Sequence, residues 1–195
     1  MPKIGIVTVL YKSDAVLDDF FKSISCQNYT NYILYIIDNS ATPESKQLVF
    51  EYSSKYKILN HIVYLPSEDN IGVAAGNNVG ILAAQKDNCE YVLLSNNDIL
   101  IQDEDLFGNM ISEIESKKIK ILIPKIHFYD SNEIWFISGY INKFRAKCFH
   151  TNNYKVDNGQ FDYLTECTYA PTCFMLFHKS VFEKIGLMDE KYFVY

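Results

Sequence analysis

The sequence predicts an α/β fold with a mostly parallel central sheet covered by helices on both faces. From residue 3 to about residue 124, short apolar runs alternate with segments of helical spacing, which is the pattern of βαβ units. The apolar runs are nearly continuous, as expected for strands that are buried on both faces. After residue 125 the segments become shorter and mixed, which predicts an α+β C-terminal portion.

Five strands are expected in the first part, each an apolar run bounded by polar or turn residues. Helices are expected where apolar residues recur at helical spacing, or where a capping residue or a proline marks a helix start. The predicted order is strand 3–10, a helix capped by Ser13 or Asp14, strand 32–39, a helix from Pro43 to about Tyr56, strand 61–66, helix 69–85, strand 91–95, a helix around 103–116 and strand 120–124.

Residues 1–195 are predicted to form a single domain, because no linker, repeat or low-complexity segment divides them. Its βαβ half covers 1–124 and its α+β half covers 125–195. In the second half, the predicted segments are apolar runs at 134–141, 143–149 and 161–177 and a terminal helix at 179–186.

The composition, 48% apolar and 22% charged, is that of an ordinary globular protein. A net charge of −6 without a polybasic face argues against nucleic-acid binding. Of two short basic stretches, 117–120 is interpreted as the solvated end of a helix. The other, 143–147, alternates as on an exposed strand; contact with an anionic acceptor or a membrane surface is the alternative.

Cysteine and histidine positions indicate neither disulfides nor zinc. The five cysteines are an odd number without a Cys-x-x-Cys pair, and the four histidines are scattered. Reduced thiols fit a cytoplasmic protein. The N-terminus leads directly into a strand, so no signal peptide is expected, and no apolar run approaches the roughly 20 residues that span a bilayer.

Polar side chains close three of the predicted strands. Thr8 and Tyr11 lie at the end of the first strand, Asp38 ends the second, and Asn96-Asn97-Asp98 follows the strand 91–95. The carboxyl ends of parallel strands share one edge of a sheet, and open sheets bind ligands there. One polar strand end is usually a turn, but three at one edge favour a binding site.

Three common catalytic or phosphate-binding motifs are absent from the sequence. It has no G-x-x-x-x-G-K-[ST], no G-x-S-x-G, and no G-x-G-x-x-G after the first strand. The remaining carboxylates and amides suit Mg²⁺ or Mn²⁺, which take one or two carboxylates together with substrate phosphates. Such a cation would let an acidic protein hold a diphosphate.

Four segments carry a resemblance to a known family. They are "IVTVLYKSDAVLDDFFKSISCQNY…YIIDNSA", "NIGVAAGNNVGI", "VLLSNNDI" and "APTCFMLFHKSVFEKIGLMDEKYF". In this order and spacing they resemble the family 2 glycosyltransferases of the GT-A fold, a Rossmann-like α/β/α arrangement, and especially the rhamnosyltransferase-like branch. The resemblance covers essentially the whole chain. It implies inverting, metal-assisted transfer of a sugar from a nucleotide-diphosphate sugar to a glycan or polysaccharide acceptor.

The resemblance also implies roles for individual residues. Asp38 matches a residue that accepts a hydrogen bond from a pyrimidine base, which implies a UDP- or dTDP-linked donor. Asp98 matches the metal-binding carboxylate of a D-x-D motif whose first carboxylate is here Asn96, so Mg²⁺ or Mn²⁺ alone should bind weakly. The implied donor-binding residues are Thr8, Tyr11, Asp38, Asn70, Gly72, Asn77, Asn96 and Asn97.

Structural roles for the same positions stay open at this point. Asp38 can cap the helix that follows it, and Asn70 can act as a helix cap or turn residue. The glycines recurring every four residues from Gly72 to Gly80 most simply let a helix approach the sheet closely. Trp135 either packs in the core or stacks on a sugar.

Inverting transfer needs a base that takes the proton of the acceptor hydroxyl. In the resembled family this base follows the segment matched by "GLMDEKYFVY", so we expect it beyond Tyr195, while Asp189 and Glu190 match positions that shape the acceptor side. Two explanations are open: a fragment of a longer enzyme, or a naturally short protein. In either case residues 1–195 should bind donor and transfer poorly.

The resemblance assigns residues 1–124 to the nucleotide sugar and residues 125–195 to the acceptor, a glycan or lipid-linked glycan. A peripheral contact of the exposed segment 143–149 with the inner face of a membrane is a further expectation. The alternative function is a non-catalytic nucleotide-sugar-binding or scaffold protein. A sugar-nucleotide pyrophosphorylase is disfavoured, because "LYKSDAVLDD" after the first strand is neither glycine-rich nor strongly basic.

Overall fold

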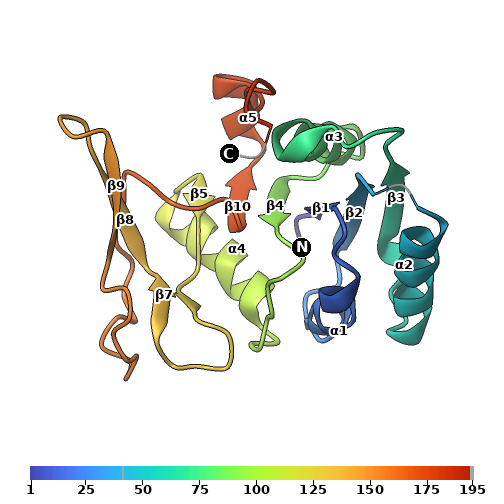
Figure 1. Ribbon diagram of the computed structural model, residues 1–195. Helices are drawn as coiled ribbons and strands as arrows, with labels where there is room; N and C mark the ends of the chain where they lie inside the picture. The colour runs from blue at the N-terminus through green and yellow to red at the C-terminus, as the bar shows by residue number, and fades with distance from the viewer. Residues whose placement is uncertain (41, 194–195) are drawn as a thin grey trace. The chain divides into compact units, whose positions relative to one another are not determined.

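The computed structural model describes residues 1–40 and 42–193 and has the predicted α/β class (Figure 1). The chain forms two compact units, one of residues 1–122 with the C-terminal residues from Cys173, the other of residues 123–172. The predicted division after residue 124 lies close to the start of the second unit. The predicted apolar run at 161–177 is divided between the units, and the predicted helix at 179–186 belongs to the first. That the whole chain acts as one domain stays a prediction.

A six-stranded sheet forms the centre of the first unit, with the strand order β3-β2-β1-β4-β10-β5. Neighbours among the first four strands pair in parallel, and β10 runs antiparallel to both β4 and β5. The sheet is therefore mostly parallel, as predicted. Its strands are β1 (Ile4–Leu10), β2 (Tyr32–Asp38), β3 (Ile62–Pro66), β4 (Tyr91–Ser95), β5 (Ile121–Leu122) and β10 (Phe174–His178).

The predicted strand 120–124 is wrong in its extent. Only β5 at Ile121–Leu122 is a strand, and it pairs with β10, not with β4. β10 takes the place beside β4 because it is a five-residue strand whose first four residues are buried. A two-residue strand buries much less apolar surface there.

Helices cover both faces of the sheet. Figure 1 shows α3 on one side of it and α1 and α4 on the other. A ring contact agrees with the position of α4 on the sheet, since the ring of Tyr32 in β2 packs edge to face with that of Phe107 in α4. Within the described residues no helix is both long and apolar enough to cross a membrane. The helices are α1 (Leu17–Ser25), α2 (Pro43–Lys55), α3 (Gly72–Lys86), α4 (Leu106–Lys117) and α5 (Ser180–Ile185), with 3-10 turns at Asp14–Val16 and Leu59–His61.

The predicted cap of the first helix is wrong, whereas the predicted position of Pro43 in the first turn of the second helix is confirmed. The N-cap of α1 is Val16, without a side-chain hydrogen bond, because a 3-10 turn separates Ser13 from the helix. Pro43 is the first residue of α2, as predicted. Thr42 caps this helix by accepting a hydrogen bond from the amide of Ser45 at 3.1 Å.

Glycines bring α3 close to the sheet, as predicted for this helix. A Cβ at Gly76 would lie 2.9 Å from a methyl group of Val9, and one at Gly80 would overlap the side chain of Val7. Because side chains alternate along a strand, the residues between these valines point to the opposite face. Thr8 therefore faces away from α3.

The second unit contains two antiparallel strand pairs. β6 (Ile126–His127) pairs with β7 (Ile134–Phe136), and β8 (Ser138–Asn142) pairs with β9 (Lys147–Thr151). The predicted run at 134–141 is thus divided between two strands. Trp135 is half-buried, with its ring centroid 5.7 Å from that of His150, so it packs within this unit.

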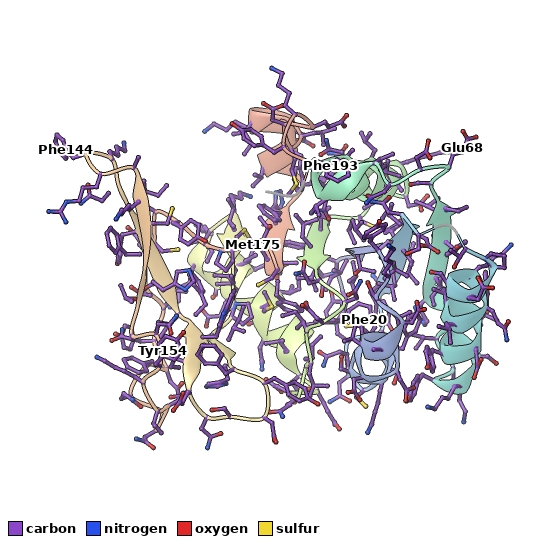
Figure 2. The ribbon with its side chains drawn as sticks, in the orientation of Figure 1. Phe20, Glu68, Phe144, Tyr154, Met175 and Phe193 are labelled. Carbon is purple, nitrogen blue, oxygen red and sulfur yellow. The ribbon has the colours of Figure 1, made fainter. Side chains whose placement is uncertain are left out.

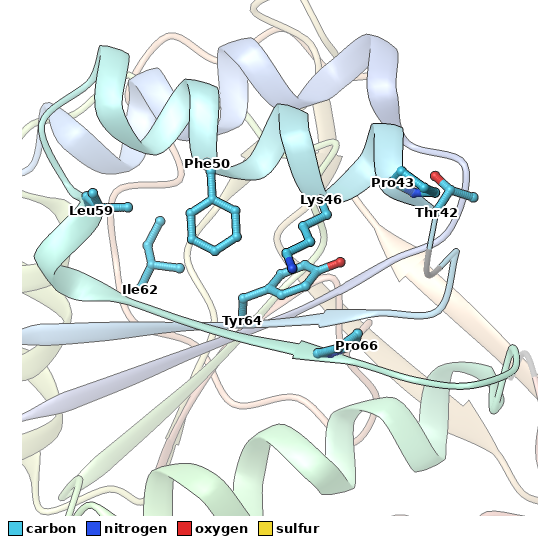
Figure 3. Close-up of a pocket in the computed structure, with 8 residues that line it drawn as sticks. All are labelled: Thr42, Pro43, Lys46, Phe50, Leu59, Ile62, Tyr64 and Pro66. Atoms are coloured by element: carbon cyan, nitrogen blue, oxygen red, sulfur yellow. The ribbon is translucent and has the colours of Figure 1, made fainter.

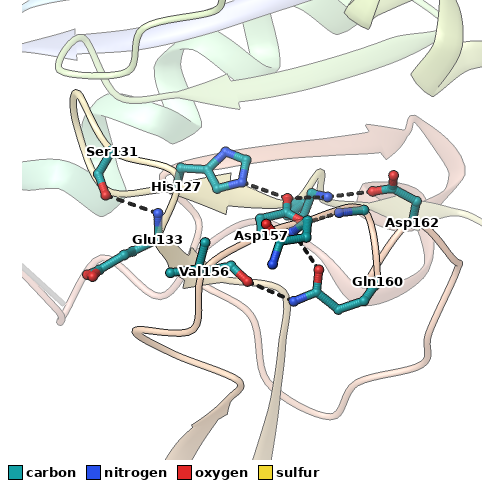
Figure 4. A network of polar contacts seen from close by, with 10 residues as sticks. His127, Ser131, Glu133, Val156, Asp157, Gln160 and Asp162 are labelled. Atoms are coloured by element: carbon teal, nitrogen blue, oxygen red, sulfur yellow. Dashed lines mark hydrogen bonds and ion pairs between the residues drawn. The ribbon is translucent and has the colours of Figure 1, made fainter.

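An ion-pair network fastens the 157–162 segment to β6 (Figure 4). The carboxylate of Asp157 pairs with Lys125 and lies 2.8 Å from Nε2 of His127. Lys125 also pairs with Asp162 at 2.5 Å. Chiefly through this hydrogen-bonded ammonium, the pKa of Asp157 is lowered to about 2.

Candidate functional site

The carboxyl ends of β1 and β4 meet at the point where the strand order of the sheet reverses. From β1 the chain proceeds outward to β2 and β3, and then returns to β4 on the other side of β1. Ligands of open α/β sheets bind in the crevice beyond the strands at such a switch point. The residues after these two strands are 11–13 and 96–98.

Asn97 joins the two strand ends. Its Nδ2 donates to the backbone oxygen of Val9 at 3.0 Å and to Oγ of Ser13 at 3.2 Å. The side chain of Asn97 is buried, while those of Asn96 and Asp98 on either side are exposed. The inward amide therefore fixes a segment that presents one amide and one carboxylate to solvent.

The exposed pair fits a divalent cation only with help from a ligand. Asp98 has no hydrogen bond or ion pair within the described residues, so its oxygens are available. No cluster of three or more His, Cys, Asp or Glu side chains suited to a metal occurs in residues 1–40 and 42–193. One carboxylate and one amide suit Mg²⁺ or Mn²⁺ that takes its other ligands from phosphates and water.

Cys173 is a neighbour of this segment that the sequence did not single out. Its backbone oxygen accepts a hydrogen bond from the amide of Asn96 at 2.8 Å, just before β10. Burial, and then the nearby Asp98 carboxylate, raise the pKa of Cys173 to about 11. The thiol is therefore protonated at neutral pH and is a poor nucleophile.

Asp38 is fully buried at the end of β2. Its carboxylate accepts hydrogen bonds from the amide of Ser40 at 2.9 Å, the hydroxyl of Ser45 at 2.7 Å and the hydroxyl of Tyr64 at 2.7 Å. Burial, together with this hydrogen bond, raises the pKa of Tyr64. Asp38 thus links β2 to the first turn of α2 and to β3, although the N-cap of α2 is Thr42.

Asn70 and Gly72 form a hydrogen-bond network together with Asn39. Oδ1 of Asn70 accepts hydrogen bonds from the amide of Gly72 at 3.0 Å and from Nδ2 of Asn39 at 3.2 Å. Nδ2 of Asn39 also donates to the backbone oxygen of Gly72 at 3.1 Å. Asn70 is therefore a turn residue, since the N-cap of α3 is Ile71. Oδ1 of Asn39 is buried without a partner among the described atoms.

The C-terminal segment lies against α3. The backbone oxygen of Phe193 accepts a hydrogen bond from the amide of Val73 at 2.8 Å, and a Cβ at Gly72 would lie 2.5 Å from that oxygen. Farther along α3, Asn78 exchanges hydrogen bonds of 2.9 Å with the backbone of Met188. Its Nδ2 also donates to the carboxylate of Glu190 at 2.9 Å.

The other predicted donor residues are more scattered. Tyr11 is 48% exposed after β1, with Nζ of Lys12 5.2 Å from its ring centroid. Thr8 and Asn77 are buried, but Thr8 faces away from α3, the helix that carries Asn77. Oγ1 of Thr8 has no partner among the described atoms. The structure therefore places these two on different sides of the sheet.

A groove of about 770 Å³ lies elsewhere, between α2 and the edge strand β3 (Figure 3). Its lining is mostly apolar, with the rings of Phe50 and Tyr64 5.7 Å apart and Lys46 as its only charge. It contains none of the predicted donor residues. Two of its lining residues meet Asp38: Tyr64 donates a hydrogen bond to its carboxylate, and Pro66 is its partner in the β2–β3 ladder. The lining residues are Thr42, Pro43, Lys46, Phe50, Leu59, Ile62, Tyr64 and Pro66.

Comparison of the sequence with known protein families finds a match over most of the chain. The model of glycosyl transferase family 2 matches residues 5–186. A curated relative, the low-salt glycan biosynthesis hexosyltransferase Agl10 of Haloferax volcanii, is 27% identical over 196 residues. That alignment covers 98% of this chain and 58% of the relative.

Two solved structures share the fold at low sequence identity. The mannosyltransferase PcManGT of Pyrobaculum calidifontis, in complex with GDP-Man and Mn²⁺, has a TM-score of 0.66 at 12% identity and covers 97% of this chain. S. aureus TarS 1–349, in complex with UDP, has a TM-score of 0.67 at 15% identity and covers 98% of it. The chain spans 48% and 51% of those two chains, and thus about half the length of its relatives.

Proposed function

The chain belongs to glycosyl transferase family 2 and has the GT-A fold, and we propose that it binds a nucleotide-diphosphate sugar for transfer to a glycan. The observation that carries this proposal is the bridge from Asn97 to Val9 at the switch point, with Asn96 and Asp98 exposed beside it. This arrangement offers a metal and diphosphate position where open α/β sheets bind ligands. The proposed acceptor is a glycan or lipid-linked glycan.

The proposed donor is a UDP- or dTDP-linked hexose, as in the rhamnosyltransferase-like branch, and the proposed outcome is inversion. The choice of a pyrimidine rests on the resemblance of Asp38 to a base-binding residue. In the structure this carboxylate is fully buried and accepts hydrogen bonds from Ser40, Ser45 and Tyr64, so contact with a base would require these partners to rearrange. Of the related structures, that of TarS holds UDP and that of PcManGT holds GDP-Man. Proteins of this fold therefore bind both base types, so the choice needs a direct test.

The proposed metal is Mg²⁺ or Mn²⁺, held by Asp98 with Asn96 beside it. When bound, such an ion would neutralise charge that develops on the departing diphosphate. The chain itself would orient the segment through Asn97. Thr8, Tyr11 and Asn77 stay proposed donor contacts without an arrangement that unites them.

We propose that the catalytic base lies outside residues 1–195. The two carboxylates matched to the acceptor side take part in local structure: Asp189 accepts a hydrogen bond from the amide of Lys191 at 3.1 Å, and Glu190 accepts one from Nδ2 of Asn78. Residues 1–195 should then bind donor and transfer poorly.

A second candidate, a non-catalytic nucleotide-sugar-binding protein, is favoured by the presence of a single carboxylate in the metal motif. A cytoplasmic location, at the inner face of a membrane, completes the proposal.

Calorimetric titration of residues 1–195 with UDP, dTDP and GDP in the presence of Mn²⁺ tests the donor proposal. Tighter binding of the two pyrimidine nucleotides is expected, with Asp38→Asn reducing their advantage over GDP. Tyr64→Phe is the matched control, because it removes one hydrogen bond to Asp38 and leaves the carboxylate in place. Equal or tighter binding of GDP would refute the choice of a pyrimidine donor.

A further inference from the structure

The hairpin of β8 and β9 concentrates positive charge in an acidic protein. Between Glu133 and Asp157 the sequence has no acidic residue, although the chain as a whole has a net charge of −6. Three of the four cations in this interval lie on the hairpin, and all three are exposed. The cations are Lys143, Arg145, Lys147 and Lys155.

The hairpin also carries apolar side chains that are partly or, at its tip, fully exposed. Phe144 at its tip has a relative exposure of 104%, so its ring has no protein neighbour to pack on. Figure 2 shows this ring at the end of the hairpin, directed away from the strands. Tyr140 and Phe149 form a cross-strand pair with exposures of 44% and 46%, and Ile141 on the opposite face is 45% exposed. Both faces of the distal hairpin therefore expose apolar surface, beside the 166–168 segment that hydrogen-bonds to Tyr140 and Ile141.

The tip is nevertheless a defined turn. Asn142 pairs with Lys147 as the last step of the ladder. The amide of Arg145 donates to the backbone oxygen of Asn142 at 3.2 Å and to its Oδ1 at 3.0 Å, and Ala146 has a left-handed φ of 47°. Phe144 is thus held at the apex between two cations, and no rearrangement is needed to expose it.

From this combination we propose that the β8–β9 hairpin docks on an anionic phospholipid bilayer, with Phe144 entering the interface. Cations near an anionic membrane gain electrostatic attraction, and an aromatic ring at the interface leaves water. A polyanion without an apolar phase would account for the cations but not for the uncovered Phe144. Docking itself does not depend on the proposed function. Its biological purpose does, because docking would bring the enzyme to a lipid-linked acceptor.

Flotation of residues 1–195 with vesicles tests the proposal directly. Vesicles of equal parts phosphatidylglycerol and phosphatidylcholine should bind the protein, and vesicles of phosphatidylcholine alone should not. Phe144→Ser should weaken binding at least about tenfold, because the ring no longer leaves water. The double variant Lys143→Ser with Arg145→Ser should weaken it about 30-fold at low salt.

Matched controls lie outside the hairpin. Tyr163→Ser removes an aromatic ring that is 61% exposed in the same unit, and Lys117→Ser with Lys184→Ser removes two exposed cations. Both should bind anionic vesicles as the unmodified protein does. In a Trp135→Phe background, Phe144→Trp should show a blue shift of its fluorescence on anionic vesicles only.

Several results would overturn the proposal. One is unchanged vesicle binding by Phe144→Ser or by the double charge variant, and another is the absence of binding to anionic vesicles. Binding to an RNA oligomer that equals vesicle binding and does not require Phe144 would assign the cations to a nucleic acid instead. Nucleotide affinity should be the same in all these variants, so failure here is distinct from failure of the donor site.

Discussion

Asn97 at the end of β4 donates a hydrogen bond of 3.0 Å to the backbone oxygen of Val9 near the end of β1. The same Nδ2 reaches Ser13, so one buried amide holds both strand ends at the switch point. Because the side chain of Asn97 is fixed inward, those of its neighbours Asn96 and Asp98 are directed to solvent.

Asn97→Ala should therefore lower both stability and nucleotide affinity. Losing these hydrogen bonds costs about 1–2 kcal/mol, and leaves the oxygen of Val9 without this donor. For a chain of this size each kcal/mol lowers Tm by about 2–4 °C, measurable by calorimetry. Asn96→Ala is the control: its side chain is exposed, so Tm should hold while nucleotide affinity falls. Equal Tm losses in the two variants would contradict the anchoring role.

Gly72→Ala should be strongly destabilising. Gly72 has a φ of +83°, which costs about 1–2 kcal/mol for a residue with a Cβ, and that Cβ would lie 2.5 Å from the backbone oxygen of Phe193. Gly108→Ala in α4 is the matched control, because the nearest atom to its Cβ is 3.9 Å away. It should raise stability by up to about 1 kcal/mol. Urea unfolding of both variants distinguishes them, and destabilisations of similar size would count against this role of Gly72.

Asn78→Ala should release the C-terminal segment from α3. The side chain makes hydrogen bonds to Met188 and Glu190, so its loss should speed tryptic cleavage after Lys191. Asn109→Ala, at an exposed position of α4, should leave cleavage unchanged. Mass spectrometry of timed digests measures the rate, and equal rates in both variants would show that Asn78 does not hold the segment.

The Asp157 network should stabilise the second unit in a pH-dependent way. The pKa of this carboxyl is lowered in the folded state to about 2, from an ordinary value near 3.8. Its stabilising effect is therefore complete above about pH 4 and is lost as the pH falls towards 2. The Tm difference between unmodified protein and Asp157→Asn should follow this course. Asp162→Asn, with a side chain 66% exposed, should change Tm much less. A difference that is constant from pH 6 to 2 would contradict the assignment.

The sequence predicted the class of the fold because its buried strands are local apolar runs. β1, β2 and β4 were found from such runs, and the glycines of α3 correctly indicated close packing on the sheet. The place of β10 beside β4 was missed, since pairing between residues about 80 positions apart has no local signal. Ser13 was wrongly predicted to cap the first helix. Its side chain instead accepts a hydrogen bond from Asn97, which is also about 80 positions away in the sequence and gives no local signal.

Site residues could be predicted from the sequence where they directly follow a strand, because the end of an apolar run is visible there. Asn97 was expected to contact the donor, which stays a prediction; in the structure its buried amide connects the two strand ends, and its neighbours Asn96 and Asp98 are exposed. Asn39 was not singled out, although it follows Asp38 directly and its amide orients Asn70 and Gly72. A polar residue immediately after a buried strand was the available signal.

The central claim, a metal-assisted nucleotide site at Asp98, is tested most directly by thermal shift of residues 1–195 with UDP, with and without Mn²⁺. A ligand at about 100 times its Kd adds about 2.7 kcal/mol, or roughly 5–10 °C for a chain of this size. Mn²⁺ should enlarge the UDP shift in the unmodified protein and in the control Glu113→Gln, and Asp98→Asn should remove this enlargement. No shift with a folded sample, or a full Mn²⁺-dependent shift in Asp98→Asn, would contradict it.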